Sequence, residues 1–138
     1  MFARLSGESR YRRFLHPKTE LSDRELDGLA RLDHWHHEGL IAWSPWPRTP
    51  IGVARYVRTE QFDCAEVAVT VADAWQRRGL GKALLLVLRE RAERAGIRRF
   101  TSLILWSNKA GLRLAHQLGP CRQIRSADGI VELECFCE

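Results

Sequence analysis

A basic loop with two glycines carries the clearest chemical signal in the sequence. The segment Gln76-Arg77-Arg78-Gly79-Leu80-Gly81-Lys82 follows an apolar, strand-like stretch and leads directly into a long apolar-striped stretch typical of a helix. The first N–H groups of a helix have no partner within the helix and lie at the positive end of its dipole, so they attract anions. Glycine lets the main chain approach an anion closely, and Arg77, Arg78 and Lys82 add positive charge. The loop therefore predicts a phosphate site.

Two other kinds of phosphate loop are excluded by the spacing of these residues. The sequence has no GxxxxGK[ST] motif, which the P-loop of nucleoside triphosphatases requires, and no third glycine completes a dinucleotide-binding fingerprint after Gly81. Two glycines alone are weak evidence, because glycine also ends strands and caps helices. The order of strand, glycine loop and helix is what favours anion binding here.

Glu66 is the second candidate for chemistry. It lies in the otherwise apolar segment Ala65-Glu66-Val67-Ala68-Val69-Thr70-Val71, where partial burial would raise the pKa of its carboxyl group. A carboxylate tuned in this way can act as a general base. The competing interpretation is a solvated glutamate on an edge strand.

Histidines and cysteines give no metal site. His34, His36 and His37 lie close together but lack a carboxylate or cysteine set at ligand spacing, so we expect surface histidines and no metal. The four cysteines form no CxxC pair, and we expect them to be reduced; they are Cys64, Cys121, Cys135 and Cys137.

The hydrophobic pattern predicts the elements that position these residues. A capping box at Ser22 to Glu25 starts a helix, and alternating apolar residues indicate a hairpin of two strands. The expected order is helix 22–32, strand 39–43, strands 51–58 and 65–71, helix 79–95, strand 100–106, helix 108–118 and two final strands around residues 126–129. This mixed order indicates an α+β fold with a partly antiparallel sheet covered by helices.

Size and composition set broad limits. The 138 residues fit one domain, 1–138, and the 22 Lys and Arg exceed the 17 Asp and Glu to give a net charge of +5, which suits an anionic ligand. Nucleic acid is not the expected partner, because the arginines are scattered rather than clustered. The longest apolar run, Ala83 to Leu88, is too short for a membrane span, so we expect a cytoplasmic protein. Of the five tryptophans, only Trp46 is expected outside the core.

The glycine loop resembles the signature of the GNAT N-acetyltransferase superfamily. Gln76 to Gly81 matches its Q/R-x-x-G-x-G/A motif, Ala65 to Val71 is similar to its fourth strand, and Asn108 with Leu114, Leu118 and Gly119 is similar to its N-x(5)-L-x(3)-L-G helix. The resemblance covers about residues 50 to 120. It implies a mixed, mostly antiparallel sheet of six to seven strands flanked by helices, with acetyl-CoA as co-substrate.

The resemblance also implies which residues meet the cofactor. In the superfamily the fourth and fifth strands splay apart, and pantetheine pairs with the fourth strand like an extra strand. That arrangement places Val69, Thr70 and Val71 beside the cofactor and gives Asn108 a cofactor contact. The phosphates are anchored by the loop, which consists of Gln76, Arg77, Arg78, Gly79, Leu80, Gly81 and Lys82.

Within the superfamily the chain is most similar to the acetyltransferase domain of bacterial Pat-type protein lysine acetyltransferases. The segment Ser9-Arg10-Tyr11-Arg12-Arg13-Phe14 and the helix leading to Asp33 support this likeness, and Glu66 matches the glutamate of the Pat-type A-E-x-A strand. One position departs from the family: Ala115 stands where many members have a tyrosine that protonates the leaving thiolate. His116, Ser107, a water molecule or no group at all would then take that role.

The expected function is direct transfer of acetyl from acetyl-CoA to a primary amine, with Glu66 as base. The acceptor is either a protein lysine or a small-molecule amine, and the sequence does not separate the two. The missing tyrosine favours an alternative, a non-catalytic acyl-CoA-binding sensor domain, and a weaker third interpretation is a nucleic-acid-binding module. Many superfamily members are dimers, so homodimer formation is a further expectation.

Overall fold

The computed structural model describes residues 16–18 and 32–137. The helix expected over residues 22–32 and the Pat-like segment Ser9 to Phe14 lie outside the described residues. The other expected elements all fall within the described ranges.

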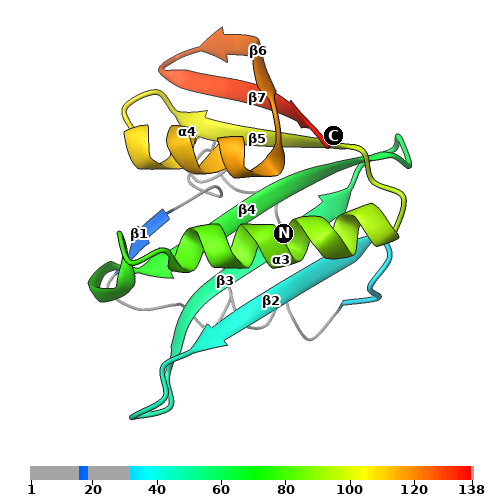
Figure 1. Cartoon of the computed structure of the whole chain (residues 1–138). Helices are drawn as coiled ribbons and strands as arrows, with labels where there is room; N and C mark the ends of the chain where they lie inside the picture. The colour runs from blue at the N-terminus through cyan, green and yellow to red at the C-terminus, as the bar shows by residue number, and fades with distance from the viewer. Residues whose placement is uncertain (1–15, 19–31, 138) are drawn as a thin grey trace.

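A seven-stranded mixed sheet forms the centre of the fold (Figure 1). Six strands run in the order β2-β3-β4-β5-β7-β6, and β1 pairs with β4 off this path. The strands are β1 (His16–Lys18), β2 (His37–Trp43), β3 (Pro50–Arg58), β4 (Cys64–Ala72), β5 (Arg99–Leu105), β6 (Cys121–Ala127) and β7 (Ile130–Phe136). Among these described strands only the β4–β5 and β1–β4 pairs are parallel, so the prediction of an α+β, mostly antiparallel sheet is confirmed.

The β3–β4 hairpin forms where alternation predicted it. Its register pairs Val57 with Glu66 and Gly52 with Val71. Side chains of a strand alternate between the two faces of a sheet, and the odd-numbered residues of β4 join the hydrophobic core, as Val67, Val69 and Val71 do. Glu66 therefore points to the opposite face from these valines.

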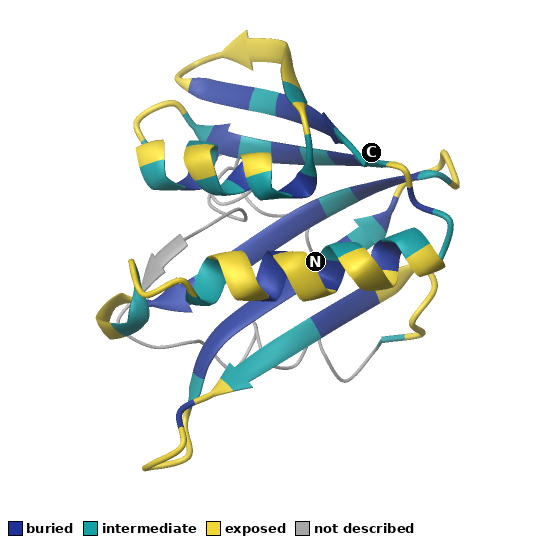
Figure 2. Cartoon of the chain, in the orientation of Figure 1, coloured by how far each residue is buried: buried dark blue, intermediate teal, exposed yellow. Residues whose placement is uncertain are grey.

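Two helices cover one face of the sheet (Figure 1): α3 (Leu80–Arg94) and α4 (Lys109–Ala115). The 3-10 helix η3 (Asp73–Trp75) precedes α3, and η4 (His116–Leu118) extends α4. Figure 2 shows the buried stripe of α3 facing the sheet and the exposed stripe facing away. The buried stripe contains Leu84, Leu85, Leu88 and Ala92, as the three- and four-residue spacing predicts. The helix ends beside Gly96, which has a φ of +86°, the conformation that glycine favours after a helix.

Strands β4 and β5 stay together over a short distance only. Three residue pairs join them, from Cys64–Arg99 to Glu66–Thr101. Beyond Glu66 the strands separate, and the edge of β4 that faced β5 next pairs with β1, at Thr70 to Ala72. This edge cannot be the β3 side, because β3 already pairs with residues 65–71 of β4. The interval 67–69 of that edge carries no strand pairing among the described residues.

Cys121 and Cys135 correct the prediction of four reduced cysteines. The register of β6 and β7 places them directly opposite each other, and they form a disulfide. Cross-strand neighbours lie within the reach of a disulfide, and this pairing depends on a register that the cysteine spacing does not reveal. Cys64 and Cys137 are free thiols.

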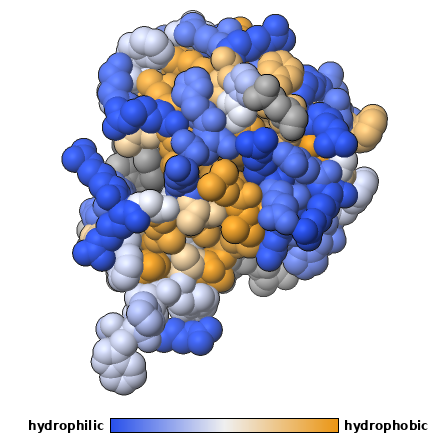
Figure 3. Space-filling model, viewed as in Figure 1, coloured by the Kyte–Doolittle hydropathy of each residue, from blue (hydrophilic) through white to orange (hydrophobic). Residues whose placement is uncertain are grey.

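The tryptophans also differ from expectation, because most of them lie at the surface. Trp35, Trp43 and Trp106 are exposed by 49%, 43% and 53%, and Trp46 by 90%. Trp46 lies in the loop between β2 and β3, which projects from the body of the protein (Figure 3). The other exposed rings are each covered by a cation: Arg58 over Trp35, Arg48 over Trp43 and Lys109 over Trp106. A cation above the ring stabilises an indole without burying it.

No helix in the described part of the chain is long and apolar enough to cross a membrane.

Gly119 offers a test of the packing between η4 and the end of β7. It has a φ of +129°, and a Cβ atom there would lie 1.9 Å from the carbonyl oxygen of Phe136. We expect Gly119→Ala to lower the free energy of unfolding by about 3 kcal/mol, because both the φ and the clash are unfavourable. Urea denaturation would measure the change.

The matched control is Gly129→Ala, in the β6–β7 turn. Gly129 also has a positive φ, of +77°, but nothing lies within 4 Å of the place that a Cβ atom would take there. Only the backbone cost of about 1 kcal/mol is expected. Equal effects of the two substitutions would show that the close contact with Phe136 does not exist in solution.

Candidate functional site

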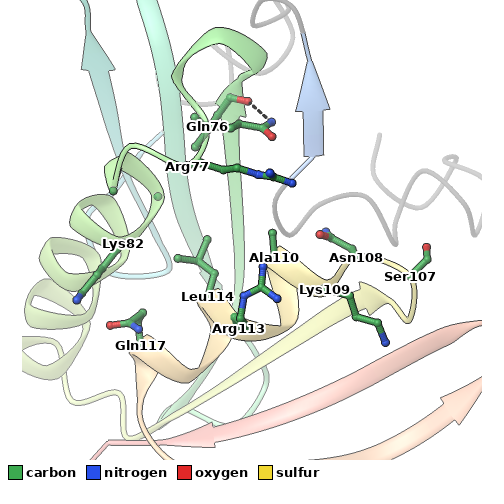
Figure 4. Close-up of a pocket in the computed structure, with 13 residues that line it drawn as sticks. Gln76, Arg77, Lys82, Ser107, Asn108, Lys109, Ala110, Arg113, Leu114 and Gln117 are labelled. Carbon is green, nitrogen blue, oxygen red and sulfur yellow. Dashed lines mark hydrogen bonds between the residues drawn. The ribbon is translucent and has the colours of Figure 1, made fainter.

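A pocket of about 640 Å³ lies between the loop before α3, the first turn of α3 and the outer part of α4 (Figure 4). Eight of its thirteen lining residues are polar or positively charged. The lining residues are Val71, Gln76, Arg77, Gly79, Gly81, Lys82, Ser107, Asn108, Lys109, Ala110, Arg113, Leu114 and Gln117.

The backbone of the loop is held open at the start of α3. Gly79 is the N-cap residue with a φ of +85°, so it has no side chain that could bond to the first N–H groups of the helix. The first N–H group satisfied within the helix is that of Ala83, which donates to the carbonyl of Gly79 at 3.0 Å. The first turn of α3 contains no acidic residue. The pocket therefore receives unpaired N–H groups and no competing carboxylate from this turn.

Gln76 fixes the loop to the end of β4. Its side-chain amide donates to the carbonyl of Val71 at 3.0 Å, and Arg77 next to it has a φ of +62°. A non-glycine residue in this left-handed region is uncommon and is held by its surroundings. The loop therefore has a defined shape before any ligand binds.

Gly81 lets the two helices approach each other. A Cβ atom at Gly81 would lie 3.0 Å from Cδ2 of Leu114 and 3.8 Å from Cγ2 of Val71. At the other end of the helix pair, the guanidinium of Arg89 donates to the carbonyl of Gln117 at 3.2 Å. The close contact and the hydrogen bond together tie α3 to α4 and η4.

Asn108 begins α4 as its N-cap. Its side-chain oxygen accepts from the N–H of Gly111 at 2.9 Å. The turns that follow place Lys109, Arg113 and Gln117 on one ridge of the helix, since residues four apart lie on the same face. All three line the pocket.

The pocket contains cations that have no acidic partner in the described ranges. Arg77, Lys82 and Arg113 line it and form no ion pair there. Elsewhere the arginines of α3 and β5 are paired, as in Arg89–Glu93 at 2.9 Å and Arg94–Glu90 at 2.6 Å. The lining includes no Asp or Glu. This excess of positive charge suits an anion with several charges.

Glu66 does not line this pocket. It is half-buried on β4 and takes part in the last residue pair before β4 and β5 separate. Val71, which does line the pocket, lies five residues further along the strand, roughly 17 Å away at the usual rise of an extended chain. The pocket and Glu66 thus mark the two ends of the divergence between β4 and β5.

Two of the three histidines, His34 and His36, lie just before β2 and His37 is its first residue; all three have acidic neighbours. The carboxylate of Asp33 accepts from the main-chain N–H groups of Trp35, His36 and His37. The hydrogen bond from His37 is the largest cause that holds the pKa of Asp33 below its usual range. His34 lies 2.9 Å from Glu38. In the described ranges, no three His, Cys, Asp or Glu side chains are grouped so that they could hold a metal ion.

The model of the acetyltransferase (GNAT) family matches residues 8–119. The chain belongs to this family. The crystal structure of the GNAT domain of S. lividans PAT is 34% identical, with a TM-score of 0.73, and the match covers 97% of this chain and 80% of that one. Both the family and the Pat-like resemblance of the sequence are therefore confirmed.

Two further relatives bear on the length of the protein and on its fold. The acetyltransferase Pat of Mycolicibacterium smegmatis is 32% identical over 130 residues, which are 94% of this chain but 38% of that protein. The chain thus spans less than half the length of that curated relative. The structure of yncA from Salmonella typhimurium with its cofactor acetyl-CoA is 24% identical, with a TM-score of 0.66, over 83% of this chain and 72% of that one. This last likeness shows the fold alone.

The fold of this protein brings part of the predicted site together in one place. Seven of the predicted residues line the pocket: Val71, Gln76, Arg77, Gly79, Gly81, Lys82 and Asn108. Five do not: Glu66, Val69, Thr70, Arg78 and Leu80. Arg78 lies just outside, with its guanidinium 4.9 Å above the ring of Trp75. Thr70 and Val71 pair with β1 along the edge of β4 where the cofactor was expected.

Sequence reasoning missed the contribution of α4 to the pocket. Lys109, Ala110, Arg113 and Gln117 line it, and none of them was a predicted site residue. The four-residue spacing of Lys109, Arg113 and Gln117 was a usable signal for one polar face. It did not show that this face meets the start of α3.

Two substitutions of Asn108 distinguish its role as the N-cap of α4 from its position in the pocket lining. We expect Asn108→Ala to lower the free energy of unfolding by about 1 kcal/mol, because the N-cap hydrogen bond to Gly111 is lost. Asn108→Asp retains a capping oxygen and should leave stability nearly unchanged, while its carboxylate weakens the binding of inorganic pyrophosphate to the pocket. Thermal unfolding and calorimetric titration would measure the two effects. Equal loss of stability in both variants would contradict the capping role.

Proposed function

We propose that the protein transfers an acetyl group from acetyl-CoA to a primary amine, of a protein lysine or of a small molecule. The observation that carries this proposal is the basic pocket between α3 and α4, at the open end of the divergence between β4 and β5. Acetyl-CoA supplies an activated acyl group on a long arm that ends in phosphates. Such a molecule needs an anion site at one end and a reaction centre at the other.

The start of α3 would hold the pyrophosphate. Its first N–H groups are free of intrahelical partners, and Arg77 and Lys82 line the same space. Charged donors bind phosphate oxygens more strongly than neutral ones do. Gly79, Leu80 and Gly81 would act through their main-chain N–H groups, and Gln76 through the loop shape that it fixes. Arg78 would add charge from just outside the pocket.

The edge of β4 would guide the arm from the pocket toward Glu66. In the described ranges the main chain of residues 67–69 carries no strand pairing on this edge, so Val69 can offer hydrogen-bonding groups. Thr70 and Val71 would contact the arm on the same edge once their pairing with β1 is released. Support for acetyl-CoA also comes from yncA, a protein of the same fold, which was solved with that cofactor.

Glu66 would act as the general base at the far end of the cleft. An amine attacks a thioester only when it is uncharged, so a carboxylate must take a proton from it, directly or through a water molecule. A main-chain N–H of β4 beside Glu66, rather than one near Val71 at the phosphate pocket, would donate to the thioester carbonyl as negative charge develops on its oxygen. The acetyl group thus moves directly to the amine without an acyl-enzyme.

The leaving thiolate of CoA must be protonated, but this protein has no tyrosine at the position that usually donates the proton. Ala115 is completely buried and has no titratable group. Of the two other side chains considered, Ser107 lines the pocket and His116 does not. Because Ser107 lies in the phosphate pocket, away from Glu66, water is the proposed proton source.

The buried Ala115 also favours a second candidate, a non-catalytic domain that binds acyl-CoA. Such a domain needs the phosphate site but no base and no proton donor. The presence of Glu66 at the point where β4 and β5 separate favours catalysis over this alternative.

Replacement of the base gives the direct test. We expect Glu66→Gln to reduce the turnover number by about 100-fold or more, since a positioned base contributes a factor of that order. Thiol release from acetyl-CoA, followed with a panel of amines and lysine peptides, would measure it. Calorimetric titration should show unchanged acetyl-CoA affinity, because Glu66 lies away from the phosphate pocket.

The matched control is Glu60→Gln, an exposed glutamate in the loop between β3 and β4, which should retain full activity. Binding of acetyl-CoA without turnover on any acceptor would support the sensor domain instead. A wild-type protein that does not bind acetyl-CoA would refute both functions.

A further inference from the structure

Thr101 of β5 lies directly beside Glu66 of β4. The register pairs the two residues, and they form the last pair before the strands separate (Figure 1). Residues paired in this way point to the same face of a sheet. The neighbours of Thr101 on β5, Phe100 and Ser102, are completely buried, whereas Thr101 is half-buried like Glu66. Glu66 and Thr101 therefore lie side by side on the face opposite the buried valines of β4.

This pair closes the gap between the two strands. Before it, Cys64 and Ala65 pair with Arg99 and Phe100, so the main-chain groups of the two strands bond to each other there. An acyl arm that follows the edge of β4 from the phosphate pocket can go no further than Glu66. The thioester and the amine that attacks it would then meet beside the side chains of Glu66 and Thr101.

The spacing of these two side chains matches the geometry of a primary amine. Neighbouring strands lie about 4.8 Å apart. A nitrogen that donates two hydrogen bonds of about 2.9 Å at a tetrahedral angle holds its two acceptors about 4.7 Å apart. An uncharged primary amine has two N–H groups and one lone pair. It can therefore donate to both oxygens while the lone pair is directed at the thioester carbon.

A hydroxyl group has an advantage over a second carboxylate at this position. It accepts a hydrogen bond without adding a negative charge, which would favour the protonated, unreactive amine. The next side chain across the sheet is a carboxylate, that of Glu134, which pairs with Thr101. It is buried and held by Arg99 at 2.9 Å and by Arg122 at 2.8 Å. Its charge is balanced within the sheet and does not compete with Glu66 for the amine.

We propose that Thr101 is a positioning residue, whose hydroxyl orients the attacking amine against Glu66. Oγ1 of Thr101 accepts a hydrogen bond from the N–H that stays on the nitrogen and becomes the amide N–H of the product. Glu66 takes the other proton, directly or through water, as the C–N bond forms. The C–S bond breaks, the released thiolate takes a proton from water, and Glu66 returns its proton to the solvent. This inference rests on the proposed function and adds the residue that aligns its acceptor.

Two substitutions of Thr101 test the role of the hydroxyl group. Thr101→Val keeps the shape and the β-branched side chain, and Thr101→Ser keeps the hydroxyl. With the fastest acceptor from the panel of amines and lysine peptides, kcat should fall about 10-fold in Thr101→Val, because one orienting hydrogen bond is lost. Thr101→Ser should retain a kcat close to that of the wild type. The affinity for acetyl-CoA, measured by calorimetric titration, should be unchanged in both, since Thr101 does not line the phosphate pocket.

The matched control is Ser102→Ala, the next residue on the same strand. Its side chain points to the other face, is completely buried, and has no hydrogen-bond partner in the described ranges. Loss of this hydroxyl group should leave kcat unchanged and should not lower the stability, because no hydrogen bond is broken. Thermal unfolding of the three variants would show that β5 is intact in each of them.

A wild-type kcat in Thr101→Val would overturn the inference. So would an equal loss of kcat in Thr101→Ser and Thr101→Val, because the shape of the side chain would then matter and its hydroxyl would not. Either result leaves the proposed function intact. A wild-type protein that releases no thiol from acetyl-CoA with any acceptor would instead refute the proposed function, and this inference with it.

Discussion

The brief pairing of β4 with β5 is the constraint on which the candidate site depends. The two strands are parallel and share only three residue pairs, so they separate toward their carboxyl ends. Each strand leads into a helix at that end, β4 into α3 through η3 and β5 into α4. Both helices therefore begin at the same edge of the sheet. The separation gives these two helix starts room to face one space instead of closing over a continuous sheet.

Close contact between the helices turns that space into a defined pocket. Gly81 faces Leu114 and Val71 without a side chain of its own, so the start of α3 can lie directly against α4. A larger residue would push the helices apart and widen the pocket. The same glycine belongs to the loop that presents main-chain N–H groups. One residue thus serves packing and anion binding together, and the hydrogen bond from Arg89 to Gln117 fixes the other end of the helix pair.

Local patterns predicted the elements and the loop, but not the contacts between distant elements. The periodicity of Leu84, Leu88 and Ala92 placed α3 to within a residue at each end, because an amphipathic helix records its buried face in its own sequence. The position of Arg113 in the pocket depends on how α4 packs on α3, which no local pattern contains. The disulfide between Cys121 and Cys135 depends likewise on the register of β6 and β7. The tryptophans show the same limit. The ring of Trp35, just before β2, is covered at 4.0 Å by Arg58 of β3, a partner that can be identified only after the sheet has formed.

The unpaired cations have a consequence for the free protein. Arg77, Lys82 and Arg113 face one space, and their mutual repulsion opposes the packing of α3 against α4 until an anion neutralises them. Any anion that fills the pocket is therefore linked to folding as well as to recognition. A ligand at about 100 times its dissociation constant adds about 2.7 kcal/mol to the stability of the folded state. If that anion is acetyl-CoA, its concentration in the cell would set the fraction of this protein that stays folded and escapes proteolysis, in addition to the rate of the reaction.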